Sequence, residues 1–171
     1  MPFSVKLALT ILVIAAAGTD LRIRRIPNWI TVPGAAVGFA LQAYNGGLRG
    51  ALSSLAGAGL GLAIFIALYV AGGMGAGDVK LFGAVGALTG PEPLVLIFVL
   101  TGLLGGIAAA VLAASRGRLR ATLERTGELL LDLGRLRWQE VRKNSAAPDA
   151  LRLPYGAVIA GGTLLSLVVL H

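Results

Sequence analysis

Two aspartates, Asp20 and Asp78, stand out because they are acids at the ends of long apolar runs. Five of the other six acids lie between Glu124 and Asp149, and Glu92 lies in a turn. An acid costs about 2.5 to 3.5 kcal/mol at the centre of a membrane helix. Two neighbouring carboxylates that share one proton can activate a water molecule and polarise a carbonyl group. This pair therefore predicts hydrolysis of a peptide bond by acid–base chemistry.

The composition places these acids in a membrane protein. The chain has 171 residues, of which 56% are hydrophobic and 13% charged, and its mean hydropathy is +0.83. It is too apolar for a soluble domain of this size. The chain has no cysteine, and its single histidine is His171. Cysteine nucleophiles and iron–sulfur clusters are therefore excluded, and we expect neither a bound metal nor a cofactor.

The sequence contains six apolar runs, whose lengths can be compared with the roughly 20 residues that a helix needs to cross a bilayer. They cover residues 7–18, 30–43, 51–71, 79–88, 94–114 and 153–170. Proline, glycine and asparagine mark the breaks between them, which favours helix ends there. The breaks contain Pro27 with Asn28, residues 45–47, residues 72–77, and Gly90 with Pro91. We predict an all-α polytopic membrane protein with about six transmembrane helices in a single domain, 1–171.

One polar region, residues 115–150, separates the fifth apolar run from the sixth. Its leucines recur at roughly helical spacing, and its charged residues fall mostly elsewhere. This pattern predicts an amphipathic helix on the cytoplasmic membrane surface, with Trp138 as an anchor at the interface. A structural role for this helix is favoured over substrate docking.

The basic residues predict the orientation, because cytoplasmic loops carry an excess of lysine and arginine. With the amino terminus outside, only Lys6 and Arg49 of the fifteen basic residues stay outside. The net charge of +7 then reflects topology and anionic lipid, and no nucleic-acid partner is expected. In this orientation Asp20 ends the first helix and Asp78 starts the fourth, both on the cytoplasmic side.

The stretch GGMGAGDVK, residues 72–80, places Asp78 behind four glycines. The run that follows, 79–88, spans only about 15 Å of a hydrocarbon core about 30 Å thick. One end of this helix is therefore expected below the membrane surface, where irregular backbone must be buried in protein or line a watery cavity. Helix dipoles favour a negative charge at a helix start, which predicts an ionised Asp78 and a protonated Asp20.

Two motifs together resemble the prepilin peptidases, the GxGD class of intramembrane aspartyl proteases. They are DLRIRRIPNWIT at 20–31 and GAGDVK at 75–80, about fifty residues apart. The resemblance covers roughly residues 7–114. A third stretch, LPYGAVIAGG at 153–162, is similar to the Pro-Phe-Gly element near the last helix of these enzymes.

The resemblance implies that Asp20 and Asp78 are the catalytic pair. It also implies cleavage of the short basic leader from type IV prepilin precursors at the cytoplasmic face of the inner membrane. The residues expected to support the substrate or the site are Gly75, Gly77, Lys80, Pro27, Asn28, Pro154, Tyr155 and Gly156. Three roles are open for Lys80: holding a lipid phosphate, orienting the loop, or approaching the leader carbonyls. For Asn28, two roles are open: capping the second helix or touching the substrate.

The sequence differs from the larger members of this family, and the differences narrow the expected activity. Bifunctional prepilin peptidases carry an additional soluble domain with a CxxC pair and methylate the new amino terminus, whereas this chain has no cysteine. Methyl transfer is therefore not expected. The Ile-Pro-Asn form is most similar to peptidases of the Flp or tight-adherence pilus systems, with archaeal preflagellin peptidases next in pattern. Whether the chain forms a homo-oligomer stays open.

Two other classes of function compete with the peptidase. A transporter would use the two acids to relay protons or bind a cation, and it predicts acids near the midplane and internal symmetry. A non-catalytic assembly protein would carry the pair without using it. Both acids are expected at the inner face and the sequence shows no repeat, so the peptidase is favoured.

Overall fold

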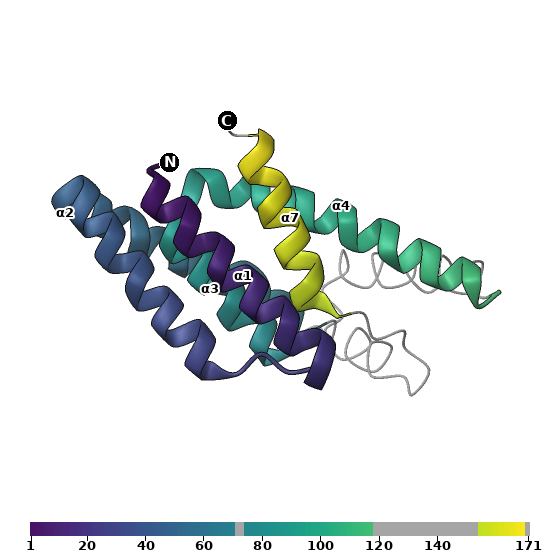
Figure 1. Cartoon of the computed structure of the whole chain (residues 1–171). Helices are drawn as coiled ribbons and strands as arrows, with labels where there is room; N and C mark the ends of the chain where they lie inside the picture. The colour runs from purple at the N-terminus through teal and green to yellow at the C-terminus, as the bar shows by residue number, and fades with distance from the viewer. Residues whose placement is uncertain (71–73, 118–153, 170–171) are drawn as a thin grey trace.

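The computed structural model describes residues 1–70, 74–117 and 154–169, and these ranges contain helices and no strand. The helices are α1 (Phe3–Ile23), α2 (Asn28–Val70), α3 (Ala76–Thr89), α4 (Pro91–Ser115) and α7 (Tyr155–Val169) (Figure 1). The expected all-α fold is confirmed. The expected amphipathic helix lies outside the described residues, except at its first few positions.

Three of the described helices are long and apolar enough to cross a membrane by length and composition. They are α1, α2 and α4, with 21, 43 and 25 residues. Helices α3 and α7 have 14 and 15 residues, fewer than the roughly 20 that span a bilayer. The expected membrane protein is therefore confirmed in a coarser form, with three candidate spans, and six transmembrane helices stay a prediction.

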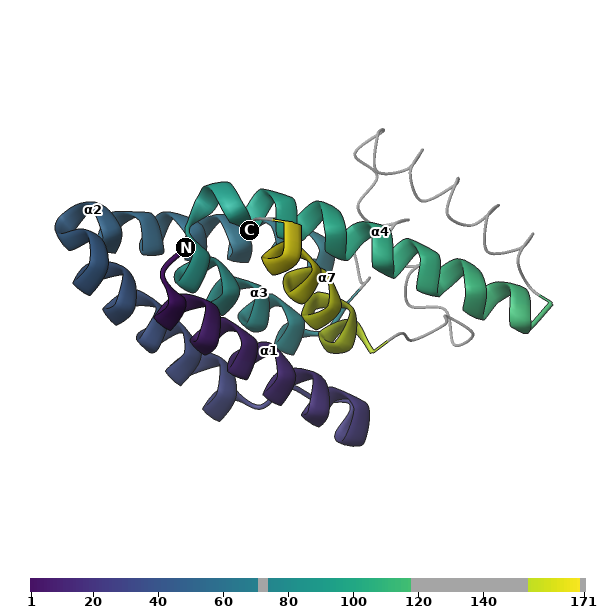
Figure 2. The same ribbon diagram turned by 45° about the horizontal axis from the view of Figure 1, so that its top comes forward.

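The end of α1 and the starts of α2, α3 and α7 gather at one end of the bundle (Figures 1 and 2). Helix α1 ends where Arg24 adopts left-handed φ and ψ angles of 51° and 36° and donates its N–H to the carbonyl of Asp20. After a short link, the carbonyl of Pro27 accepts the N–H of Ile30 in the first turn of α2. The link therefore turns the chain back beside α1.

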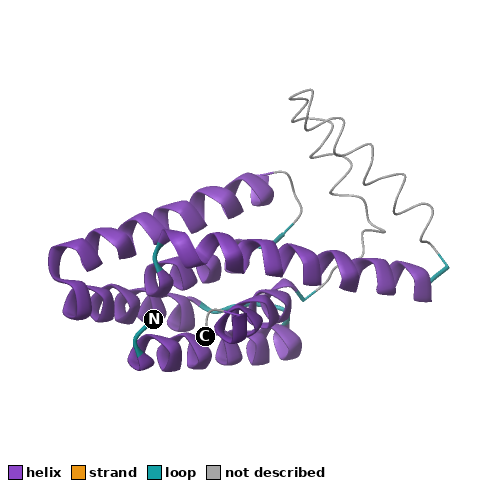
Figure 3. Cartoon of the chain, turned by 90° about the horizontal axis from the view of Figure 1, so that it is seen from above, coloured by secondary structure: helices purple, strands orange, loops and turns teal. Residues whose placement is uncertain are grey.

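Helix α2 consists of two arms, 28–46 and 48–70, that fold back on each other at Gly47 (Figure 3). The φ and ψ angles of Gly47 are 57° and −138°, which glycine adopts without the steric cost that a side chain would bring. The expected break at 45–47 is thereby confirmed.

Helix α3 packs between the two arms of α2, and most of its residues are buried. Because it ends inside the bundle, its last carbonyls need partners other than water. Gln42 of the first arm donates to the carbonyl of Leu88 at 2.8 Å, and Ser54 of the second arm donates to that of Ala87 at 2.7 Å. The expected short helix is present with 14 residues, whereas the depth of its Asp78 end below the membrane surface stays a prediction.

We expect Gly57→Ala to destabilise the protein by about 1 to 3 kcal/mol, because the end of α3 leaves no room for a side chain at this position of the second arm of α2. A Cβ at Gly57 would clash with the carbonyl oxygen of Gly86 and lie 2.8 Å from the Cα of Gly90. Thermal unfolding of the purified protein in detergent measures the change. Gly59→Ala is the matched control, since a Cβ at Gly59 meets nothing within 4 Å. Equal stability of the two variants would contradict this packing.

Candidate functional site

Asp20 lies in the last turn of α1, and only 7% of its surface is exposed. Its Oδ2 accepts the backbone N–H of Gly156 at 2.8 Å. Gly156 belongs to the first turn of α7, which begins where the carbonyl of Pro154 accepts the N–H of Ala157. Asp20, although it belongs to the end of α1, therefore lies against the start of α7, where unpaired N–H groups favour an anion.

Asp78 lies in the first turn of α3 and is 8% exposed. Its Oδ2 accepts the N–H of Gly75, the residue that precedes the helix, at 3.0 Å. This reach back from the third helical residue is one half of a capping box. It explains why α3 begins at Ala76, two residues before Asp78, the expected start of the fourth helix. Asp78 is therefore inside the helix and held by its own turn.

Ile26 lies between the two aspartates, in the link from α1 to α2, and is 8% exposed. A Cβ at Gly77, the residue before Asp78, would lie 3.1 Å from the Cβ of Ile26. A Cβ at Gly156 would lie 2.9 Å from the Cδ1 of Ile26 and 2.9 Å from the Cβ of Asp20. Ile26 thus lies close to Gly77, which precedes Asp78, and to Gly156, which binds Asp20, so the segments that carry the two acids meet at this side chain.

The structure thus brings together two acids that lie 58 residues apart in the sequence. Ile26 is not among the expected site residues. The signal that points to it is a single apolar residue between Arg25 and Pro27, buried in a link where a polar residue is more usual.

The start of α7 contacts both halves of this site. Gly156 binds Asp20 and lies close to Ile26, and the neighbouring Tyr155 is half-buried. Pro154 precedes the helix and accepts the first N–H groups of α7 on its carbonyl. These three expected residues therefore lie at the site.

Lys80 and Asn28 form a second link between α3 and α2, on the exposed surface. The Nζ of Lys80 donates to the Oδ1 of Asn28 at 2.9 Å. The bond joins the first residue of α2 to the second turn of α3. Of the three alternatives for Lys80, this contact corresponds to orienting the segment that carries Asp78.

The two carboxyl groups have similar backbone partners. The expected split, with Asp78 ionised and Asp20 protonated, treats Asp20 as lying at a helix end alone. Because α7 starts at Asp20, each acid lies at a helix start and accepts one N–H. At Asp20 the dipoles of the α1 end and the α7 start therefore oppose each other, and the expected split stays a prediction. Among the described residues, no group of three His, Cys, Asp or Glu side chains is placed to hold a metal ion.

Comparison with known proteins identifies the family of the chain. The model of the type IV leader peptidase family matches residues 7–110, more than half of the chain. The chain belongs to the type IV leader peptidase family. No curated protein and no solved structure matches it. The resemblance inferred from the two motifs is confirmed, and its expected range, 7–114, nearly equals the matched one.

Family and composition together make this leader peptidase an integral membrane protein. The matched range contains both aspartates and both motifs, and it ends before α7. The hydrogen bond from Gly156 to Asp20 thus joins the matched part of the leader peptidase to a helix outside it.

We expect Lys80→Met and Asn28→Ala each to lower kcat/KM of the leader peptidase about two- to fivefold, because each removes the same exposed hydrogen bond. The double variant should lose no more than the worse single variant, which a double-mutant cycle on leader cleavage measures. Lys6→Met, in the first turn of α1 at the opposite end of the bundle, is the control. Fully additive losses would contradict a shared positioning role.

Proposed function

We propose that this leader peptidase is an aspartic endopeptidase with Asp20 and Asp78 as its catalytic pair. The observation that carries the proposal is the burial of both acids at one end of the bundle, with Ile26 close to Gly77 beside Asp78 and to Gly156 beside Asp20. Both backbone N–H groups are donated to Oδ2 atoms. We therefore assign the Oδ1 atoms to the water and to the scissile peptide.

Catalysis begins with one carboxylate ionised and the other protonated. The ionised carboxylate takes a proton from water while the water oxygen bonds to the peptide carbon, and the protonated acid gives its proton to the carbonyl oxygen. The product of this step is a neutral gem-diol. The first acid then protonates the amide nitrogen, the C–N bond breaks, and one diol proton returns to the second carboxylate. Both groups end as they began.

The substrate we propose is a type IV prepilin of the Flp-like class, cleaved after its short basic leader without later methylation. Family membership supports a prepilin-type substrate, and the resemblance of the Ile-Pro-Asn form supports the Flp-like class. Acids at helix ends, rather than at mid-helix, favour a peptidase over the transporter alternative.

The site lies, in this proposal, on the cytoplasmic side of the inner membrane, with the amino terminus outside. Arg22, Arg24, Arg25 and Lys80 lie at the same end of the bundle as the two acids. Lys6 lies in the first turn of α1, at the other end. An excess of positive charge marks the cytoplasmic side of a membrane protein.

The proposed function is tested by mixing the purified protein in liposomes with candidate prepilin precursors. We expect one cut between leader and mature chain, resistant to chelators and to serine or cysteine reagents. A precursor whose leader has already been removed is the control substrate. Failure of folded protein to cleave any precursor, together with proton flux across the same liposomes, would support the transporter instead.

The proposed side is tested by labelling, because the chain has no cysteine of its own. Single cysteines replace Arg24 at the site end and Arg49 after the Gly47 turn. On intact cells a membrane-impermeant thiol reagent should modify Arg49→Cys, and Arg24→Cys only after permeabilisation. The reverse pattern would place the site outside.

A further inference from the structure

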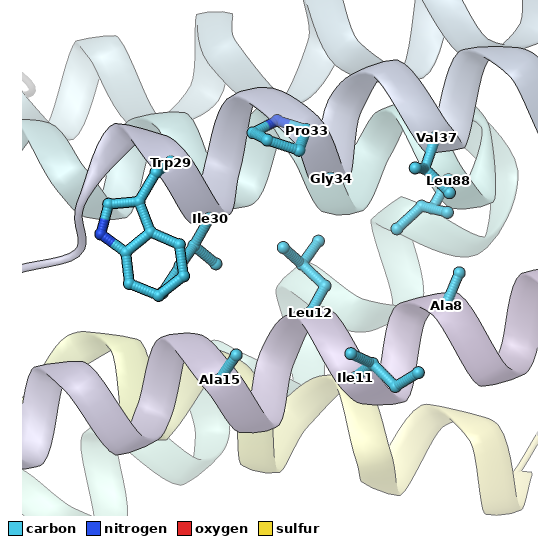
Figure 4. A pocket seen from close by; sticks show the side chains of 10 residues that line it. All are labelled: Ala8, Ile11, Leu12, Ala15, Trp29, Ile30, Pro33, Gly34, Val37 and Leu88. Atoms are coloured by element: carbon cyan, nitrogen blue, oxygen red, sulfur yellow. The ribbon is translucent and has the colours of Figure 1, made fainter.

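An apolar groove lies between α1 and the first arm of α2, on the surface of the bundle (Figure 4). Its volume is about 360 Å³. Residues of both helices form its walls, and Leu12 and Leu88 point into the space between them. The wall residues include Ala8, Ile11 and Ala15 from α1, and Trp29, Pro33 and Val37 from α2. We refer to this feature as the α1–α2 groove.

The groove opens towards the surroundings of the protein. Ile11 is 60% exposed and Trp29 70% exposed, so its walls contribute apolar surface to the outside of the bundle. For a membrane protein those surroundings are lipid at this depth, and a lipid acyl chain matches walls of this chemistry.

The α1 wall continues towards the site end of the bundle. Positions 8, 11 and 15 follow helical spacing, which brings Gly18 and Arg22 next on the same face. A Cβ at Gly18 would meet nothing within 4 Å, so the face stays open there. Arg22 is exposed and lies about 10 Å beyond Ala15 along the helix axis.

The link between the two helices crosses this same end of the groove. It carries Arg24 and Arg25, both exposed, and leads into the first turn of α2, where Trp29 lines the groove. Tryptophan favours the level of the lipid headgroups, and arginines at a membrane surface attract anionic lipid. The groove therefore has apolar walls along its length, the indole ring of Trp29 at one end, and arginines beyond that end. An anionic phospholipid has the same order of parts, from acyl chain through the interface to a charged headgroup.

We propose that the α1–α2 groove binds one anionic phospholipid of the bilayer. An acyl chain lies between α1 and the first arm of α2, and the headgroup phosphate pairs with Arg22 and Arg25. Arg25 is next to Ile26 in the link, so the bound lipid restrains the residue at which the segments that carry the two aspartates meet. This lipid site is separate from the proposed peptide cleavage and does not depend on it.

Trp29 reports on the groove directly, because the chain has two tryptophans and Trp138→Phe leaves Trp29 alone. Full-length Trp138→Phe protein is reconstituted in vesicles with small amounts of brominated phosphatidylglycerol or brominated phosphatidylcholine. Bromine quenches tryptophan fluorescence at contact. Each arginine near an anionic lipid is worth about fivefold in binding, so two arginines predict at least a tenfold preference for the anionic lipid.

Arg22→Gln with Arg25→Gln should remove this preference while quenching by neutral lipid remains. Lys6→Gln with Arg49→Gln, which removes as many charges away from the groove, should leave it unchanged. The readout is fluorescence, so a failure here is distinct from a failure of leader cleavage.

Three results would overturn the lipid site. Equal quenching by the two lipids in the unaltered groove would show ordinary bilayer contact only. Relief of quenching by stoichiometric prepilin precursor, equal for both lipids, would assign the groove to the substrate helix. Relief that grows with the protein-to-lipid ratio would assign it to a second copy of the chain.

Discussion

Asp20→Asn and Asp78→Asn each lower kcat/KM for leader cleavage by at least about a thousandfold, because an amide neither takes a proton from water nor gives one to the carbonyl oxygen. Acid–base groups typically contribute 10² to 10⁴ to a rate, and here both act in one transition state. The double variant should be no slower than the worse single variant, since residues that act as a unit are not additive. Single-turnover cleavage of a labelled precursor in liposomes measures these rates.

The amide variants keep the shape of the site, which makes them informative. An asparagine oxygen can still accept the N–H of Gly156 or of Gly75, so the unfolding temperature should stay near that of the wild type. Glu92→Gln, in the first turn of α4, is the control for loss of an acid away from the site. Undiminished cleavage by either aspartate variant would remove that residue from the mechanism.

The helix breaks are predictable from the sequence because they are set by local backbone effects. Pro27, Gly47 and Gly90 mark breaks both in the expected pattern and in the structure. Proline lacks an N–H, and glycine adopts positive φ, as at Gly47 and Gly90 with 57° and 77°. These effects require no knowledge of the rest of the fold.

The helix ends near the site are less predictable, because hydropathy marks the apolar run and not the helix. Helix α1 continues five residues past Gly18, since Thr19 donates to the carbonyl of Ala16 within the helix and the turn closes only at Arg24. Helix α3 begins early because Asp78 caps its own first turn. The acids therefore lie within helices, whereas the apolar runs end just before Asp20 and begin just after Asp78.

The partners of the site residues depend on long-range contacts, which the sequence does not reveal. The two motifs identify Asp20 and Asp78, and the depth argument places them at one level, but neither supplies the partner of Asp20. That partner, Gly156, is 136 residues away. Likewise, glycines at close helix crossings are expected in general, whereas the pairing of Gly57 with Gly86 depends on how the arms of α2 enclose α3.

Gly156→Ala lowers kcat for leader cleavage by about ten- to a hundredfold, although it adds a single methyl group. That methyl would lie 2.9 Å from the Cβ and the Oδ2 of Asp20 and from the Cδ1 of Ile26. Real Cβ atoms do not approach this closely, so Asp20, Ile26 or the start of α7 must move. A displacement below 1 Å at a reacting group is enough for a loss of this size.

The control for this methyl group is Gly161→Ala, five residues along the same helix. Its Cβ would lie 3.3 Å from the Cδ1 of Leu104, the end of a flexible side chain that can turn away. If α7 only stabilises the bundle, both variants should change the unfolding temperature and cleavage in proportion. If the start of α7 positions Asp20, Gly156→Ala alone should lose kcat with little change in KM, at an unfolding temperature near that of Gly161→Ala. Proportional effects in the two variants would therefore reduce α7 to a packing helix and leave Asp20 without a positioning partner.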